Sequence, residues 1–260
     1  QAKRALQRTL EQANRNRGGG DDVLRLPSMW STVCDPLLAE MVLVGDGVER
    51  REVEAAFLRT LAPRSVDVVD VQRVQNASLW RCFAVKRHCM GVREAAAPSL
   101  SSSLSSSAAA KSPSATASSS SAGFERRWLF HGTNKEVMPA IVQQGFNRSF
   151  CGKNATVYGK GVYFARDAKY SARRCYSIPD ADGIQYMLLC RVAVGHYCMG
   201  EVNARAPAVR HGHVLYDSTC GLLTPPEVPV VDTLANPSIF VTYHDSQAYP
   251  EYLLRFRATN

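Results

Sequence analysis

The stretch "TVYGKGVYFARDAKYSARRCYS", residues 156–177, contains the pattern on which the fold and the function of this chain depend. At first it looks like a glycine-rich phosphate loop. A Walker loop requires Ser or Thr after its lysine, however, and here Lys160 is followed by Gly161. The dinucleotide fingerprint G-x-G-x-x-G fails as well, because its third glycine would fall on Phe164. The glycines therefore need another explanation, which the following strand provides.

That strand, "GVYFA", sends alternate side chains to opposite faces, which separates Tyr163 from Phe164. The segment "LFHGT" at 129–133 is built similarly: an apolar strand ends in His131, and Gly132 lets a ligand approach the backbone. Either ring-bearing residue alone is more often an ordinary core residue. Two glycine-flanked strands that each deliver one such residue favour a flat heteroaromatic ligand, held by ring stacking and backbone hydrogen bonds.

Apolar periodicity predicts only a few helices. Residues 51–61 have apolar side chains at helical spacing. Residues 134–146 are the second case, in which Val137 and Ile141 share a face and Gly145 stands where a helix C-cap belongs.

Residues typical of β-strands dominate much of the remaining sequence. Residues 66–76 are strand-like, 79–90 fit either a strand or a helix, and six more strand-like segments follow residue 123. These six are "RRWLFHG", "GVYFA", "YMLLCRVAVGHYCMG", "HVLYDS", "SIFVTYHD" and "EYLLRFRA". Many strands, few helices and no βαβ alternation predict an α+β domain with a mainly antiparallel core.

Two segments have compositions that disfavour a packed core. Residues 94–123 are rich in Ala and Ser and hold a single charge after Glu94, so we expect them to be disordered. Residues 1–17 carry +4 of the formal net charge of +8. This tail suits a solvated helix or a linker, although an acidic partner, RNA or a membrane surface would fit the same charge.

The eight cysteines include no CxxC pair and lie mostly among apolar residues, which indicates reduced, buried thiols in an intracellular protein. Three short His/Cys groups lack the paired spacing of structural zinc sites, so we expect no metal. These groups are His88-Cys89, His196-x-Cys198 and His211-x-His213. No apolar run is long enough to cross a bilayer.

Taken together, the motifs resemble the catalytic domain of the poly(ADP-ribose) polymerase (PARP) family, in the H-Y-E class related to diphtheria toxin. The resemblance rests on "LFHGT" and on "GFNRSFCGKNATVYGKGVYFARDAKYSARRCYS". Flanking motifs in matching order are "LPSMW", "VEAAFLRT", "VQRVQNASLWRCFAVKRHCM", "RAPAVRHGHVLYDS" and "NPSIFVTYHDSQAYPEYLLRF". The resemblance covers residues 23–260 apart from 93–123. It implies one domain with a mainly antiparallel, split β-sheet core and few helices, the diphtheria-toxin-like ADP-ribosyltransferase fold.

Under this resemblance, residues 93–123 become a disordered Ala/Ser-rich insertion in a surface loop rather than a domain boundary. Such an insertion is tolerated because the entropy of loop closure grows only slowly with loop length. Residues 1–22 become a basic tail or linker.

The resemblance implies that the ligand is NAD, bound as a substrate and without a metal. His131 would bond ribose hydroxyls, and the Gly132 backbone and the Ser171 hydroxyl would meet the nicotinamide carboxamide. Tyr163 and Tyr176 would sandwich the nicotinamide ring. Further contacts, to the adenosine and diphosphate end, are implied for Thr133, Asn147 and Arg148.

The third position of the catalytic set decides the product. Glu251 in "YPEYLLRF" is a tempting candidate, but the family's glutamate starts the strand that corresponds here to "SIFVTYHD". The set is then His131, Tyr163 and Ile239. A carboxylate at the third position would stabilise the positive charge that develops on the ribose and activate the hydroxyl of a growing polymer. Isoleucine does neither.

The resemblance thus implies a mono-ADP-ribosyltransferase, in which the acceptor's own carboxylate assists the reaction and then receives the ADP-ribose. The expected acceptors are Glu and Asp side chains of proteins, this chain included, in the cytoplasm or nucleus and without a membrane partner. Two alternatives stay open: transfer to terminal phosphates of RNA or DNA, and a catalytically silent module that binds NAD or ADP-ribose. A plain scaffold would make the placement of His131 and Tyr163 a coincidence.

Overall fold

The computed structural model describes residues 23–31, 38–63, 65–95, 124–150, 156–222 and 236–259. The predicted tail at 1–22 lies outside these residues. So does the predicted insertion, except at its start, where helix α3 (Ala77–Ala95) extends three residues into the range 93–123.

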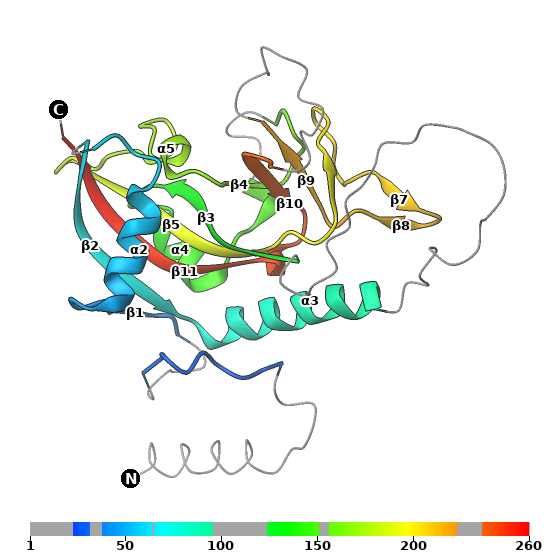
Figure 1. Cartoon of the computed structure of the whole chain (residues 1–260), viewed down its shortest axis with the longest axis horizontal. Coiled ribbons are helices and arrows are strands. Elements are labelled where there is room, and N and C mark those ends of the chain that lie inside the picture. The colour runs from blue at the N-terminus through cyan, green and yellow to red at the C-terminus, as the bar shows by residue number, and fades with distance from the viewer. Residues whose placement is uncertain are drawn as a thin grey trace, which may run out of the picture.

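Nine strands form one sheet in the order β1-β2-β11-β5-β3-β4-β10-β9-β6 (Figure 1). Their bounds are β1 Glu40–Leu43, β2 Val66–Gln75, β3 Glu125–Thr133, β4 Val162–Ala165, β5 Ile184–Ala193, β6 Tyr197–Met199, β9 Ser218–Gly221, β10 Ile239–Thr242 and β11 Ala248–Ala258. All neighbours are antiparallel except β6 and β9. Strands β7 (Val209–His211) and β8 (Val214–Leu215) form a separate hairpin. This arrangement confirms the predicted α+β class with a mainly antiparallel core.

The sheet is split between β3 and β4. Strand β3 is in register with β5 along most of its length, but with β4 only at Phe130, which lies opposite Ala165. The two strands diverge on either side of that pair. Five strands therefore lie on one side of the split and four on the other, and His131 and Tyr163 lie where the two parts meet.

Helices cover both faces of the larger part. Helix α2 (Val48–Leu58) packs Val53 and Phe57 onto one face, where the Phe57 ring centroid lies 5.0 Å from that of Phe256. Helix α5 (Ala168–Ser171) joins this face. Helix α4 (Met138–Gln144) covers the opposite face with Ile141 and Val142. The short 3-10 helices η2 and η3 span Arg148–Phe150 and Asp245–Gln247.

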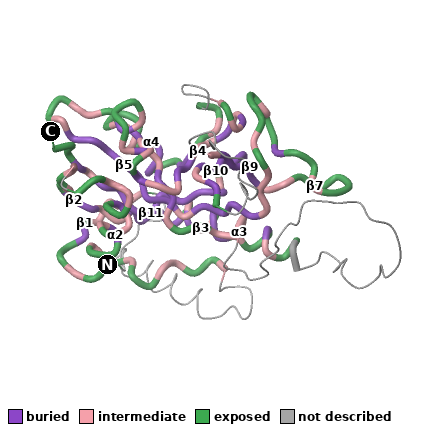
Figure 2. Tube along the Cα trace, turned by 45° about the horizontal axis from the view of Figure 1, so that its top comes forward, coloured by how far each residue is buried: buried purple, intermediate pink, exposed green. Residues whose placement is uncertain are grey.

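The strands at the centre of the sheet, β5 and β11, are almost entirely buried (Figure 2). The ambiguous segment 79–90 belongs to α3, because Trp80, Phe83 and Met90 form one apolar helix face that packs around Tyr249. The opposite face of α3 exposes Val85 and other residues, so the segment as a whole shows no clear helical periodicity.

Two details of the sequence analysis are wrong. Val137 does not share the buried face of Ile141, since it precedes α4 and is 41% exposed. The described cysteines are free, as expected, but three of the six are exposed rather than buried: Cys82, Cys89 and Cys175. Two of them lie on α3 and the third on the segment after α5.

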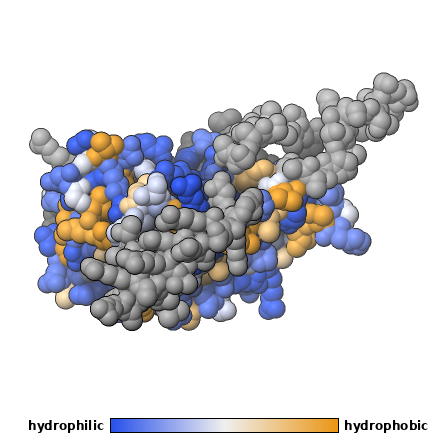
Figure 3. Space-filling model, turned by 90° about the horizontal axis from the view of Figure 1, so that it is seen from below, coloured by the Kyte–Doolittle hydropathy of each residue, from blue (hydrophilic) through white to orange (hydrophobic). Residues whose placement is uncertain are grey.

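None of the helices among the described residues is long and apolar enough to cross a membrane. The face seen in Figure 3 mixes hydrophilic with hydrophobic side chains. Within the same described ranges, no group of three or more His, Cys, Asp or Glu side chains is arranged to hold a metal ion.

Candidate active site

His131 and Tyr163 meet directly beyond the single pair that joins β3 to β4. The His131 ring nitrogen Nδ1 lies 2.8 Å from the backbone oxygen of Tyr163. A carbonyl oxygen can only accept, so Nδ1 carries the proton and Nε2 is left as an acceptor. Burial lowers the pKa of His131 and outweighs this hydrogen bond, which alone would raise it. The ring is therefore kept neutral. Phe146 and Phe164 pack against the ring.

Gly132 allows the segment after β4 to approach β3 closely. A Cβ atom at this position would lie 2.6 Å from the Ser171 backbone oxygen and 2.9 Å from Ser177 Oγ. The Ser171 hydroxyl donates to the backbone oxygen of Phe130 at 3.0 Å, so it lies against β3 beside Gly132. Thr133 is buried and ends the strand. The predicted neighbours Gly132 and Ser171 are therefore in contact.

Tyr170 and Tyr176 form a pair of contacting side chains. The contact holds Tyr176, one of the predicted site residues, in place. Their ring centroids are 4.7 Å apart and their hydroxyl oxygens 2.6 Å apart. Burial, together with the bond to Tyr176, raises the pKa of Tyr170 above its ordinary value, so that its phenol stays protonated. The sequence analysis missed Tyr170, although it precedes Ser171 directly as Tyr176 precedes Ser177.

Ile239 is the first residue of β10, lies opposite Ala165 of β4 and is 1% exposed. Its buried neighbours are Ala165, Val241 and Tyr243, and the partly buried Tyr158, Tyr163 and Tyr170 pack against the same cluster. None of these neighbours carries a carboxylate. The third position therefore lies in an apolar cluster, against which two tyrosines of the site, Tyr163 and Tyr170, also pack.

The glycines of the opening stretch serve close packing. A Cβ atom on Gly159 would overlap the Tyr243 hydroxyl, and one on Gly161 would overlap the backbone oxygen of Thr242 on β10. The space gained lets the Tyr163 hydroxyl donate to the Gly159 oxygen at 2.9 Å and accept from the Tyr158 amide at 2.9 Å. The glycines thus fix the Tyr163 ring and form no phosphate cradle.

Two further tyrosines complete this support, and the sequence analysis missed both. The hydroxyl of Tyr243 bonds to Thr219 Oγ1 at 3.1 Å and to the Tyr158 oxygen at 3.3 Å. The Tyr158 hydroxyl donates to the backbone of Leu222, and its ring lies where any side chain on Gly221 would be. The glycines of the turn that follows Tyr158 were the sequence signal of this packing.

Asn147 and Arg148 lie at the other end of β10. The Arg148 guanidinium donates to the Tyr243 backbone oxygen at 2.8 Å, and its amide donates to Asp245 Oδ1 at 3.1 Å. Asn147 Oδ1 accepts from the Ser149 amide at 2.8 Å. These bonds anchor η2 to the β10–η3 turn, and the predicted contacts of both residues with NAD remain predictions.

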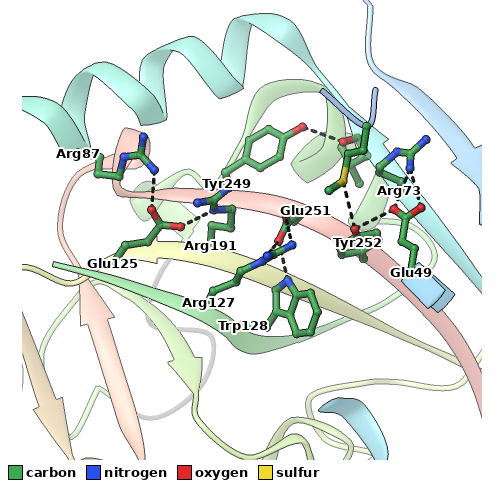
Figure 4. A network of polar contacts seen from close by, with 12 residues as sticks. Glu49, Arg73, Arg87, Glu125, Arg127, Trp128, Arg191, Tyr249, Glu251 and Tyr252 are labelled. Carbon is green, nitrogen blue, oxygen red and sulfur yellow. Dashed lines mark hydrogen bonds and ion pairs between the residues drawn. The ribbon is translucent and has the colours of Figure 1, made fainter. Parts of the chain in front are cut away.

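Glu251 belongs to a separate polar network on β11 (Figure 4). One carboxylate oxygen accepts from Trp128 Nε1 at 2.6 Å, and Arg127 binds the carboxylate at 3.2 and 3.3 Å. Strands β5, β3 and β4 separate β11 from β10, which carries Ile239. Glu251 is therefore a buried structural carboxylate that ties β11 to β3.

The chain is similar in sequence to known proteins. The poly(ADP-ribose) polymerase catalytic domain matches residues 48–258. The chain is 31% identical to human protein mono-ADP-ribosyltransferase PARP14 over 235 residues, which is 89% of this chain. It is 43% identical to mouse protein mono-ADP-ribosyltransferase PARP10 over 128 residues, 48% of the chain. With human protein mono-ADP-ribosyltransferase PARP12 the identity is 30% over 239 residues, 90% of the chain.

The chain spans only a minor part of these three relatives, 11%, 12% and 28% of their respective lengths. The similarity thus concerns one domain of larger proteins, and it is this domain that contains the β3–β4 junction.

Proposed function

Since the chain belongs to the poly(ADP-ribose) polymerase catalytic-domain family, we propose that it is a protein mono-ADP-ribosyltransferase. It moves one ADP-ribose from NAD to a Glu or Asp side chain of another protein or of itself, and releases nicotinamide. One observation carries the proposal. His131 and Tyr163 are linked, and the third position beside Tyr163 is an isoleucine, Ile239, which carries no carboxylate and packs in an apolar cluster.

In this proposal the nicotinamide ring lies between Tyr163 and Tyr176. The hydroxyl bonds that fix Tyr163 and the Tyr170–Tyr176 bond support this role, because stacking needs rings with fixed orientation. The Gly132 backbone meets the carboxamide, and the Nε2 lone pair of neutral His131 accepts from a ribose hydroxyl.

Transfer breaks the bond between the ribose C1′ and the nicotinamide nitrogen, whose electron pair leaves with neutral nicotinamide. Positive charge then develops on the ribose, as in other glycosyl transfers. The acceptor carboxylate stabilises that charge and forms the new C1′–O bond, so no proton has to be moved. A polymer would require activation of a ribose hydroxyl, for which Ile239 has no base to offer. A single transfer follows.

The compartment proposed is the cytoplasm or nucleus. The exposed free thiols Cys82, Cys89 and Cys175 support this proposal, because such thiols persist where the surroundings are reducing.

Automodification with labelled NAD tests the proposal, with products resolved by size for the parent and the His131→Ala variant. His88→Ala is a matched control, because His88 is exposed on α3, away from the β3–β4 junction. We expect a discrete band in the parent and the control that hydroxylamine removes, and no band in His131→Ala.

A high-molecular-weight smear would contradict the role of Ile239. Absence of label together with NAD or ADP-ribose binding in calorimetry would identify a silent module. Label on a phosphorylated oligonucleotide, and none on protein, would favour nucleic-acid modification instead.

A further inference from the structure

A cationic cavity of about 130 Å³ lies where β3 leaves β4, outside the proposed NAD site. We call it the arginine cavity, because its lining includes Arg59, Arg126, Arg127 and Arg166, together with Asn236 and Phe240. The first half of β3 forms one wall. Residues just after the end of β4 and around the start of β10 form the other wall.

The charges around the arginine cavity do not balance. Arg166 binds the Asp167 carboxylate at 2.7 Å, and Arg127 binds Glu251. Arg59 also approaches Asp167, at 3.9 Å, so these two carboxylates are shared among the arginines of the lining, which outnumber them by two. An anionic group is the ligand that such a cavity attracts.

Arg126 is the arginine best placed to receive that ligand. It forms no ion pair with any residue that the structure describes, and its guanidinium carbon lies 5.8 Å from the centroid of the Phe240 ring. Its side chain is exposed and therefore reachable from solvent. A planar guanidinium binds a carboxylate through two parallel hydrogen bonds, so Arg126 is equipped for an acidic side chain.

The cavity also borders an open strand edge. Before Phe130, the β4 side of β3 has no strand partner within the described ranges. Such an edge presents backbone N–H and C=O groups that can pair with an extended peptide. A nucleic acid would use the arginines for its phosphates, but it could not form this backbone ladder.

The cavity adjoins the proposed reaction site along two strands. Arg166 directly follows Ala165, which lies opposite Ile239, and its amide donates to the Ser238 oxygen at 2.8 Å. Residues of an extended peptide advance by about 3.3 Å each. A carboxylate held in the cavity therefore leaves the next residues of the same peptide within reach of Ile239.

We propose that the arginine cavity binds an acidic side chain of an extended acceptor segment that pairs with the open edge of β3. This contact positions a neighbouring carboxylate of the segment for transfer, and it thus rests on the proposed function. The cavity, of about 130 Å³, is large enough to admit a carboxylate group. The preferred substrates are then proteins in which acidic residues are clustered.

Fluorescence anisotropy without NAD tests the site independently of catalysis. The probe is a fluorescein-labelled 12-residue peptide in which Glu alternates with Ser, compared with the same peptide carrying Gln for Glu. Arg126→Gln should weaken binding of the Glu peptide about tenfold, the usual effect of losing one charge-assisted hydrogen bond. Arg51→Gln is the matched control, since Arg51 is exposed on α2 and outside the lining, and it should leave affinity unchanged.

A second measurement links the cavity to transfer. With labelled NAD, Arg126→Gln should raise the KM for the peptide about tenfold and leave the KM for NAD unchanged. Equal peptide affinities of the parent and Arg126→Gln, at equal thermal stability, would overturn the proposal. Tighter, Arg126-dependent binding of a 5′-phosphorylated oligonucleotide in place of the peptide would overturn it as well. Arg126-dependent binding without any transfer would support the site and leave only the proposed function refuted.

Discussion

The packing of Gly159 against Tyr243 provides the sharpest test of how this site is built. Gly159 has φ +117°, a conformation that side chains other than glycine rarely adopt, and a Cβ atom would overlap the Tyr243 hydroxyl. Strain at such a φ costs roughly 1–3 kcal/mol. Displacing the hydroxyl also weakens its bonds to Thr219 and Tyr158, at about 1 kcal/mol each. Gly159→Ala should therefore lower the free energy of unfolding by about 3–5 kcal/mol.

Urea unfolding of matched variants separates the two contributions. Gly183 has φ +76° but open space around its Cβ position, so Gly183→Ala measures strain alone, about 1–2 kcal/mol. In a Tyr243→Phe background the overlapping oxygen is absent. The loss of unfolding free energy caused by Gly159→Ala should then be smaller by at least about 1 kcal/mol. This difference is the coupling energy between the two contacting residues.

The same substitution should affect the site, because the Gly159 oxygen accepts the hydroxyl bond of Tyr163. At temperatures where Gly159→Ala is folded, its KM for NAD should rise. A Gly159→Ala variant no less stable than Gly183→Ala, or an equal cost of Gly159→Ala in the Tyr243→Phe background, would refute a clash between Gly159 and Tyr243.

Three further predictions concern single side chains. Glu251→Gln should lower the free energy of unfolding by about 1–3 kcal/mol, since Trp128 and Arg127 lose a charged acceptor, yet leave kcat unchanged; loss of transfer with an intact fold would make Glu251 catalytic. His131 should titrate by NMR below its ordinary pKa of 6.5, and because the unfolded chain then binds the proton more tightly, stability relative to His131→Gln should fall as the pH drops below about 6.5. Tyr170→Phe removes the 2.6 Å hydroxyl bond and should raise the KM for NAD about fivefold, and an unchanged KM would show that the bond is dispensable.

Local patterns were enough to predict much of the fold. The alternation in "GVYFA" predicts that Phe164 and Tyr163 face opposite sides of the sheet, and the structure confirms this: Phe164 belongs to one apolar cluster, and Tyr163 packs against another that contains Ile239. The predicted helix at 51–61 exists, although it begins at Val48 and ends at Leu58. Boundaries differ because caps and turns depend on contacts made elsewhere in the molecule.

Residues whose roles come from distant contacts could not be predicted. Tyr158 and Tyr243 are 85 positions apart and meet only because β10 lies beside β4. Likewise, no periodicity indicates that Tyr170 turns its hydroxyl to Tyr176. The arginine cavity joins four separate parts of the sequence, and only the tertiary fold places its charges together.

The position of β11 has a consequence for synthesis in the cell. This strand lies between β2 and β5, yet it is the last of the nine in the sequence. While a ribosome is still translating the chain, β2 and β5 each present an edge whose proper neighbour has not been made, and such edges invite pairing with the wrong strand. We therefore expect the nascent domain to be prone to mispairing until β11 emerges. A message cut short before the segment that encodes β11 should therefore yield no folded domain.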